Sequence, residues 1–281
     1  MSFRPLAACL LLACLLAGST IASAQRIDPK QVESSLLVTG RIDIAADGTV
    51  LGYTLDQPGK LQPTVLNLIA GTAPQWKFEP VSEPAPQSLQ MSLRFVARRP
   101  DDTHVTVTLS SAQFGVPDPA PDTTLQLDKR KMRMPTYPKE LAEQQIEAMV
   151  YVTVRAHPDG TGDAVVRRVD LMARGSQADM ARWRNALAQR ALTAAKEWRY
   201  RVPTQGADAQ RTFWYANIPI SFTMEGEPPP YGVWQTYLPG PETPLPWENE
   251  AEKDTNYDAA VPNSITGAST ARRLLTPLSK K

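Results

Sequence analysis

The sequence predicts an α+β protein of two tandem small domains, each a hairpin-helix-strand-strand unit with its helix packed on an antiparallel sheet. Apolar and polar residues alternate over several short segments, which is typical of strands with one buried face. A weak internal repeat also occurs: strand, Asp-Gly turn, strand, helix and Trp-x-aromatic segment follow one another twice. The expected units are 25–112 and 135–224, joined by a linker at 113–134.

The N-terminal segment 1–24 has the composition of an export signal. Its apolar run, Leu6 to Gly18, is short for a membrane-spanning helix, which needs about 20 apolar residues, but it suits a secretory signal. Ala22-Ser23-Ala24 supplies the small residues of a cleavage site. We therefore expect a mature chain that begins at Gln25 and resides in the periplasm of a bacterial envelope. The alternative is that the run stays uncleaved as an inner-membrane anchor.

Cysteine content and charge exclude several classes of function. Cys9 and Cys14 both lie in the export segment, where lipidation of one of them is an alternative to simple cleavage. A chain starting at Gln25 would contain no cysteine, which excludes disulfides, cysteine catalysis and cysteine-ligated zinc. The 30 basic residues are balanced by 29 acidic ones, so we expect no nucleic-acid partner.

The first unit opens with an alternating segment in which Val38, Ile42 and Ile44 share one face. Asp47-Gly48 then favours a tight hairpin, because glycine readily adopts the positive φ values that such turns need. The elements expected after this turn are a strand at 49–56, a short helix at 61–70, the segment Trp76-Lys77-Phe78, a closing strand at 89–95 and an additional strand at 103–109.

The second unit repeats this order with a longer helix. Alternation over 150–156 predicts its first strand, Asp159-Gly160 its turn and 163–172 its returning strand. Ser176 followed by Asp179 has the pattern of a capping box at a helix start. The buried stripe of that helix is expected at Met180, Trp183, Leu187, Ala191 and Ala194. The unit ends with Trp198-Arg199-Tyr200 and a closing strand at 213–223.

Residues 225–281 form a Pro-rich and charged C-terminal tail. Seven prolines between Pro228 and Pro246 are interleaved with four aromatic residues, which excludes a regular domain. Two interpretations remain open. The tail is either an extended segment laid over the second unit or a disordered Pro-rich segment.

The second unit resembles the TonB C-terminal domain family over residues 135–224. The features that carry the resemblance are Pro135-Thr136-Tyr137-Pro138, Leu141-Ala142, the strand 150–154, Asp159-Gly160, Trp198-Arg199-Tyr200 and Ile218-Pro219-Ile220-Ser221-Phe222. The resemblance implies a periplasmic domain that contacts outer-membrane transporters by accepting one of their strands onto its sheet. The first unit lacks the Tyr-Pro motif and is the more divergent relative.

The chain departs from this family in two respects. Ala148 stands where the family usually has a glycine just before the first strand, whereas the first unit keeps a glycine as Gly40. An energy transducer that resembles TonB also has a retained N-terminal membrane helix and a long Pro-rich spacer ahead of the domain. Neither feature is evident here. The Pro-rich part of this chain follows the domain instead of preceding it.

The side chains on which enzymes depend are sparse. His104 and His157 are far apart in the sequence and lack metal-ligand spacing, and no nucleophile elbow, Walker loop or dinucleotide glycine motif occurs. Asp47 and Asp159 recur in both units, but each precedes glycine in a turn, which explains them. We expect a non-enzymatic protein with no catalytic residue, no metal site and no cofactor.

The candidate binding site is the backbone of the closing strand. Pro219 has no N–H, and proline within a strand is tolerated essentially at sheet edges. An edge strand offers unpaired backbone groups that an extended peptide can satisfy by β-augmentation. The candidate partner-binding residues are Phe213, Tyr215, Asn217, Ile218 and Ile220. The alternative is an edge covered by the chain's own tail or by a second copy in a homodimer.

The function expected from these features is that of a periplasmic adaptor that binds a protein or peptide, with an outer-membrane β-barrel transporter as a candidate partner. Once processed, the chain would not be an integral membrane protein. A TonB-type energy transducer with an uncleaved anchor is one alternative. A structural or inhibitory cell-envelope protein is the other.

Overall fold

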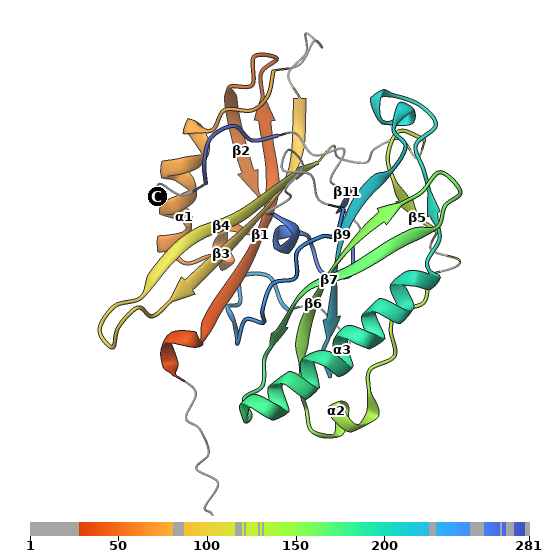
Figure 1. Cartoon of the computed structure of the whole chain (residues 1–281). Helices are drawn as coiled ribbons and strands as arrows, with labels where there is room; N and C mark the ends of the chain where they lie inside the picture. The colour runs from red at the N-terminus through yellow and green to blue at the C-terminus, as the bar shows by residue number, and fades with distance from the viewer. Residues whose placement is uncertain are drawn as a thin grey trace, which may run out of the picture.

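The computed structural model describes residues 28–80, 87–115, 120, 122–128, 130, 132–224, 229–247, 256–264, 266–267 and 273–278. The export segment expected at 1–24 lies outside the described residues. Within these ranges the chain is an α+β protein with antiparallel sheets, as the sequence predicts. A helix covers the outer face of each of two sheets, and the helix-free faces of the sheets are turned toward each other (Figure 1).

The first sheet is built around β1 (Glu33–Ile44), which pairs with β3 (Gln87–Arg98) along its whole length. On its other side, β1 pairs with β2 (Val50–Leu55) and with β10 (Gln235–Tyr237), and β4 (Thr106–Gly115) continues the sheet beyond β3. The helix α1 (Pro63–Thr72) buries Val65 and Ile69 against this sheet. Short 3-10 turns flank these elements at Pro29–Gln31, Pro58–Lys60 and Ala73–Gln75.

The second sheet has the strand order β11-β9-β6-β7 in the part of the chain that the structure describes. Its strands are β6 (Ala148–Ala156), β7 (Gly162–Leu171), β9 (Trp214–Phe222) and β11 (Thr266–Gly267). The remaining elements here are α2 (Lys139–Glu143), α3 (Gln177–Glu197), the pair β5 (Gln126–Leu127) and β8 (Tyr200–Arg201), and a 3-10 turn at Ala207–Gln210.

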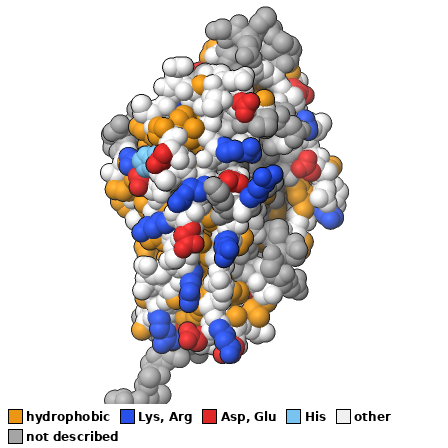
Figure 2. All heavy atoms as spheres, turned by 90° about the vertical axis from the view of Figure 1, so that its right-hand side faces the viewer, with side chains coloured by type: hydrophobic (Ala, Val, Ile, Leu, Met, Phe, Trp, Pro, Cys, Tyr) orange, Lys and Arg blue, Asp and Glu red, His pale blue; other side chains and the backbone are white. Residues whose placement is uncertain are grey.

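The helix α3 begins as the capping pattern predicts, because the Ser176 hydroxyl accepts a hydrogen bond of 3.1 Å from the Asp179 amide. Its buried stripe follows the prediction through Ala191, but the last member is Ala195, with Ala194 only partly buried. The basic residues of α3 lie between Asp179 and Glu197 in the sequence, and Arg182 pairs with Asp179 at 2.9 Å. Figure 2 shows separate basic and acidic side chains on this side of the molecule. This face is solvated.

Both hairpin turns make the same long-range contact. Gly48 and Gly160 have φ values of 83° and 78°, and a Cβ at either position would clash with the carbonyl of the aromatic residue facing it. The Gly48 carbonyl accepts a hydrogen bond of 2.8 Å from the Phe78 amide, and the Gly160 carbonyl accepts one of 2.9 Å from the Tyr200 amide. These contacts join each turn to its own Trp-x-aromatic segment.

The segment expected as a linker and part of the C-terminal tail both pack against the folded units, the tail in agreement with the interpretation of an extended segment laid over the second unit. The linker predicted at 113–134 includes the end of β4 and the strand β5, and it buries Leu125 and Leu127 in the core beneath α3. The strand expected at 103–109 runs from Thr106 to Gly115. Part of the tail is ordered on both sheets, because β10 pairs with β1 while the adjoining Leu238 bridges to Leu171 of β7.

Candidate functional site

The closing strand β9 has a neighbour on each side. Its inner side pairs with β6 from Ala148↔Phe222 to Ala156↔Trp214, and its outer side pairs with β11 through Asn217↔Thr266 and Ala216↔Gly267. The expectation that this strand ends the sheet is therefore corrected. The chain's own C-terminal segment returns to lie along it, in agreement with the alternative of an edge covered by the tail.

Asn263 extends this coverage of β9. Its backbone N–H donates a hydrogen bond of 2.7 Å to the Pro219 carbonyl, and its side-chain Oδ1 accepts one of 3.1 Å from the Ser221 amide. Because N–H and C=O of one residue in an antiparallel strand point to the same side, the missing N–H of Pro219 also faces outward. Proline consequently interrupts the outer side of β9 and leaves its pairing with β6 intact.

The structure places the five candidate residues in different environments. Ile218 and Ile220 are each 1% exposed in the core beneath α3, so their side chains are not accessible to a partner. Asn217 is equally buried and its Oδ1 accepts a hydrogen bond of 2.8 Å from the Thr153 hydroxyl. Phe213 and Tyr215 are partly exposed, with ring centroids 5.4 Å apart. Of the five, these two present side-chain surface beside the outer edge.

The opposite edge of the same sheet is also lined by the tail. Leu238 exchanges two backbone hydrogen bonds with Leu171 of β7, at 2.7 and 3.1 Å, and the Thr243 amide donates one of 2.8 Å to the Arg167 carbonyl. The Arg184 side chain of α3 reaches over this edge and donates to the carbonyls of Leu238 and Pro239 at 3.2 Å. The tail therefore satisfies backbone groups on both outer strands.

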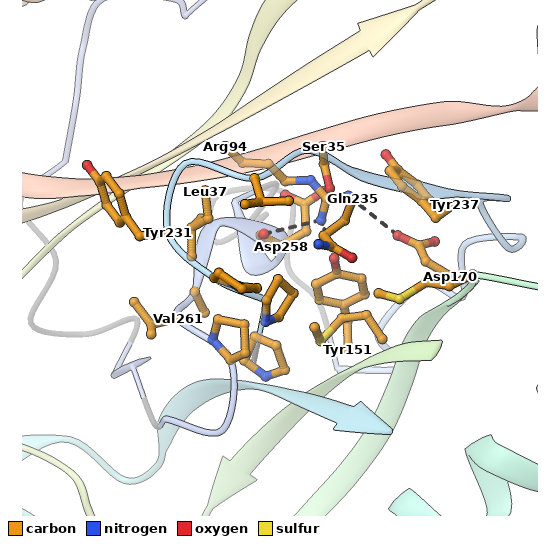
Figure 3. A pocket seen from close by; sticks show the side chains of 18 of the residues that line it. Ser35, Leu37, Arg94, Tyr151, Asp170, Tyr231, Gln235, Tyr237, Asp258 and Val261 are labelled. Atoms are coloured by element: carbon orange, nitrogen blue, oxygen red, sulfur yellow. Dashed lines mark hydrogen bonds and ion pairs between the residues drawn. The ribbon is translucent and has the colours of Figure 1, made fainter. Parts of the chain in front are cut away.

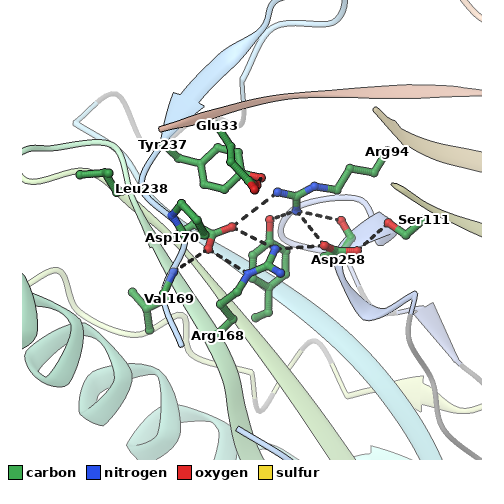
Figure 4. Close-up of polar contacts among 12 residues, drawn as sticks. Glu33, Arg94, Ser111, Arg168, Val169, Asp170, Tyr237, Leu238 and Asp258 are labelled. Carbon is green, nitrogen blue, oxygen red and sulfur yellow. Dashed lines mark hydrogen bonds and ion pairs between the residues drawn. The ribbon is translucent and has the colours of Figure 1, made fainter. Parts of the chain in front are cut away.

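Between the two sheets lies a cluster of charged residues drawn from three segments (Figure 4). Arg94 comes from β3, Arg168 and Asp170 from β7, and Asp258 from the 3-10 turn Tyr257–Ala259 of the tail. Arg94 Nη2 lies 3.5 Å from Asp170 Oδ2, and Arg168 lies 2.9 Å from Asp170 and 3.0 Å from Asp258. Ser111 of β4 donates a hydrogen bond of 2.5 Å to Asp258.

This polar cluster is electrically balanced, with two guanidinium groups against two carboxylates. Burial alone would raise the pKa of Asp258, but the Arg94 and Arg168 guanidinium groups and the Ser111 hydroxyl hold it below its usual value. Arg94 also donates to the Tyr151 hydroxyl, and burial raises the pKa of that phenol to about 12. At Asp170 burial outweighs the same two cations and raises the pKa of the carboxyl group. Both carboxylates contact guanidinium groups, and these ion pairs attach Asp258 of the tail to β3 and β7.

The titratable residues outside the cluster serve local structure. His104 contacts Asp101 at 2.8 Å on the surface, and His157 contacts Asp163 at 3.0 Å beside a hairpin turn. Asp47 accepts the Thr49 amide at 2.9 Å, and Asp159 accepts the Thr161 amide at the same distance, as turn residues do. Across the described residues, no group of three or more His, Cys, Asp or Glu side chains could hold a metal ion.

The sequence did not predict the polar cluster or the covering role of Asn263. The members of the cluster are distant in sequence and lie in segments whose alternation predicts only which face they occupy. Within the described ranges, no helix is both long and apolar enough to cross a bilayer. Comparisons of the chain with protein-family models, curated proteins and solved structures found no match.

Proposed function

We propose that the chain is a non-enzymatic periplasmic adaptor, resembling the TonB C-terminal domain, that binds an extended peptide or a segment of an outer-membrane transporter by β-augmentation along the outer edge of β9. The observation that supports this most directly is that this edge already accepts a short strand in antiparallel register, namely Thr266 and Gly267 of the same chain, with Asn263 hydrogen-bonded to Pro219 beside them. Backbone hydrogen bonds of this kind do not depend on the sequence of the added strand.

The covering segment makes a short pairing that a partner could replace. β11 is two residues long, whereas β6 pairs with β9 over its whole length on the inner side. A longer partner strand would form more backbone hydrogen bonds with β9 than the tail does. Pro219 sets one constraint on that partner, because it offers a carbonyl but no N–H at its position.

The repeated contacts of the two turns support a tandem arrangement of units. In each half, the turn glycine accepts the amide of the aromatic residue that ends a Trp-x-aromatic segment, Phe78 in one and Tyr200 in the other. We take residues 25–112 as a divergent TonB-C-like unit and 135–224 as the unit that binds. The tail then connects them, because β10 joins the first sheet and β11 joins the second.

A pull-down from solubilised outer membranes tests the proposal. The mature chain, an Asn263→Ala variant that weakens the tail on β9, and a Gln189→Ala control on the exposed face of α3 serve as baits. We expect β-barrel transporters to be enriched by the mature chain and more strongly by Asn263→Ala, with Gln189→Ala equal to the mature chain. Equal capture by all three baits, or no capture, would contradict binding at this edge.

Two further measurements distinguish the alternatives. Sequencing of the N-terminus of the protein from cells is expected to give Gln25, whereas a retained N-terminal segment in the membrane fraction would favour an anchored energy transducer. Sedimentation with purified cell-wall sacculi, without enrichment of any transporter, would instead favour a structural envelope protein.

A further inference from the structure

A cavity of about 220 Å³ lies between the helix-free faces of the two sheets. Its walls come from β1 and β3 of the first sheet, from β6, β7 and β9 of the second, and from the tail residues 229–237 and 258–262 (Figure 3). Neither sheet alone encloses this space. The cavity exists because the tail closes it on two sides.

Most of the cavity wall is apolar and adaptable. Leu37 of β1, Met149 of β6 and Met172 beyond β7 face it, and the tail adds the exposed Val233, the ring of Tyr231 and several prolines. Methionine side chains are flexible and polarisable, so they fit ligands of varied shape. The Tyr231 ring is held in place because its hydroxyl donates a hydrogen bond of 3.2 Å to the Thr39 carbonyl.

The charged end of the cavity disfavours a charged ligand. Arg94, Asp170 and Asp258 line it, and Arg168 contacts both carboxylates from behind. Two cations and two anions already balance there. An additional buried charge would have to compete with these ion pairs for a partner of opposite sign, and a buried charge that remains unpaired is strongly unfavourable.

Two neutral polar side chains at this end remain available. Ser35 of β1 and Gln235 of β10 are directly opposite each other in the strand register, and both line the cavity. Neither the Ser35 hydroxyl nor the Gln235 amide has a hydrogen-bond partner in the described part of the protein. Figure 3 shows both on the side of the cavity where Arg94 lies. A primary amide such as that of Gln235 can donate and accept at once, so its natural complement is another amide.

We infer that this cavity is a binding site for a neutral, apolar small molecule that carries one amide group, with the amide on Gln235 and Ser35 and the apolar part against Leu37, Met149 and Met172. An apolar cavity of about 150 Å³ holds a benzene molecule, so in proportion the volume here suits about nine non-hydrogen atoms. The site is separate from the outer edge of β9, and its occupancy does not require the proposed strand capture.

Methyl NMR of the mature chain with labelled methionines tests the assignment. Phenylacetamide, which has ten non-hydrogen atoms, is the probe. Phenylacetate and phenethylammonium serve as charged analogues with the same carbon skeleton. We expect saturable shifts of the Met149 and Met172 methyl signals with phenylacetamide, and binding at least about tenfold weaker for both charged analogues. Met91 and Met180, buried in the cores beneath α1 and α3, are internal controls that should not shift.

Two variants identify the groups involved. Gln235→Leu should weaken phenylacetamide binding about tenfold through loss of the paired hydrogen bonds, whereas Gln189→Leu on the exposed face of α3 should leave it unchanged. Val233→Trp, at a position 47% exposed at the rim, should fill the cavity and abolish the shifts while the Met91 and Met180 signals stay in place. Equal affinity for the three compounds, shifts that survive Val233→Trp, or no shift at Met149 and Met172 would overturn the inference.

Discussion

Replacing Asn263 should release the C-terminal segment from β9 by an amount that the structure allows us to work out. Asn263 has a φ of 56°, and its side chain accepts the Ser221 amide. Asn263→Ala removes that hydrogen bond, worth about 1 kcal/mol, and places alanine in the left-handed region, which costs about 1 kcal/mol more than asparagine there. A total of about 2 kcal/mol corresponds to an increase of about 30-fold in the population with the segment released.

Amide hydrogen exchange measures this release. The Asn217 amide faces β11, in the register Asn217↔Thr266, whereas the Ile218 amide faces β6. In Asn263→Ala, exchange at Asn217 should accelerate about 30-fold, and exchange at Ile218 should stay unchanged. Asn263→Gly is the matched control, because it loses the hydrogen bond but tolerates the positive φ, and it should accelerate Asn217 only about fivefold. Unchanged exchange at Asn217, or equal acceleration at both amides, would refute the reasoning.

Three further predictions concern stability. Arg94→Met should lower the free energy of unfolding in urea by about 3 to 5 kcal/mol, because it leaves buried carboxylates with one cation fewer; a loss below about 1 kcal/mol would contradict this. Gly160→Ala should lower the free energy of unfolding by about 2 kcal/mol or more, since the φ of Gly160 is 78° and the added Cβ would lie 2.6 Å from the Tyr200 carbonyl oxygen. The control Gly52→Ala, with open space around it, should change the free energy of unfolding by less than about 1 kcal/mol. Burial raises the pKa of Tyr151 to about 12, so the contribution of the Tyr151 hydroxyl to stability should be complete below pH 10 and disappear as the pH rises to 12. The difference in free energy of unfolding between the natural chain and Tyr151→Phe should therefore shrink over that range. A difference that stays constant would contradict this prediction.

Local features of the fold could be predicted from the sequence because they depend on residues close together in the chain. Asp-Gly pairs mark both hairpin turns, and Ser176 marks the start of α3, through chemistry that is complete within three or four residues. Alternation likewise identifies β1 and β6. The helix stripe was displaced by one residue at its end, from Ala194 to Ala195, because a period of 3.6 residues leaves both near the same face.

The contacts made by the tail could not be predicted in this way. Arg94 and Asp258 are 164 positions apart, and β11 has too few residues for an alternating pattern. Pro219 predicted that β9 is an edge strand, and this prediction was wrong, because β11 pairs with the outer side of β9. The sequence had no means to show which segment lies there, because a two-residue pairing depends on tertiary placement and not on local propensity.

The most direct test of the account is photocrosslinking from position 215 in intact cells. A photoreactive residue in place of Tyr215, which is partly exposed beside the outer edge of β9, reports what lies along that strand. We expect crosslinks to an extended segment of an envelope protein, with a yield that rises when Asn263→Ala is added. Crosslinks only to residues of the chain's own C-terminal segment, unaffected by Asn263→Ala, would contradict it.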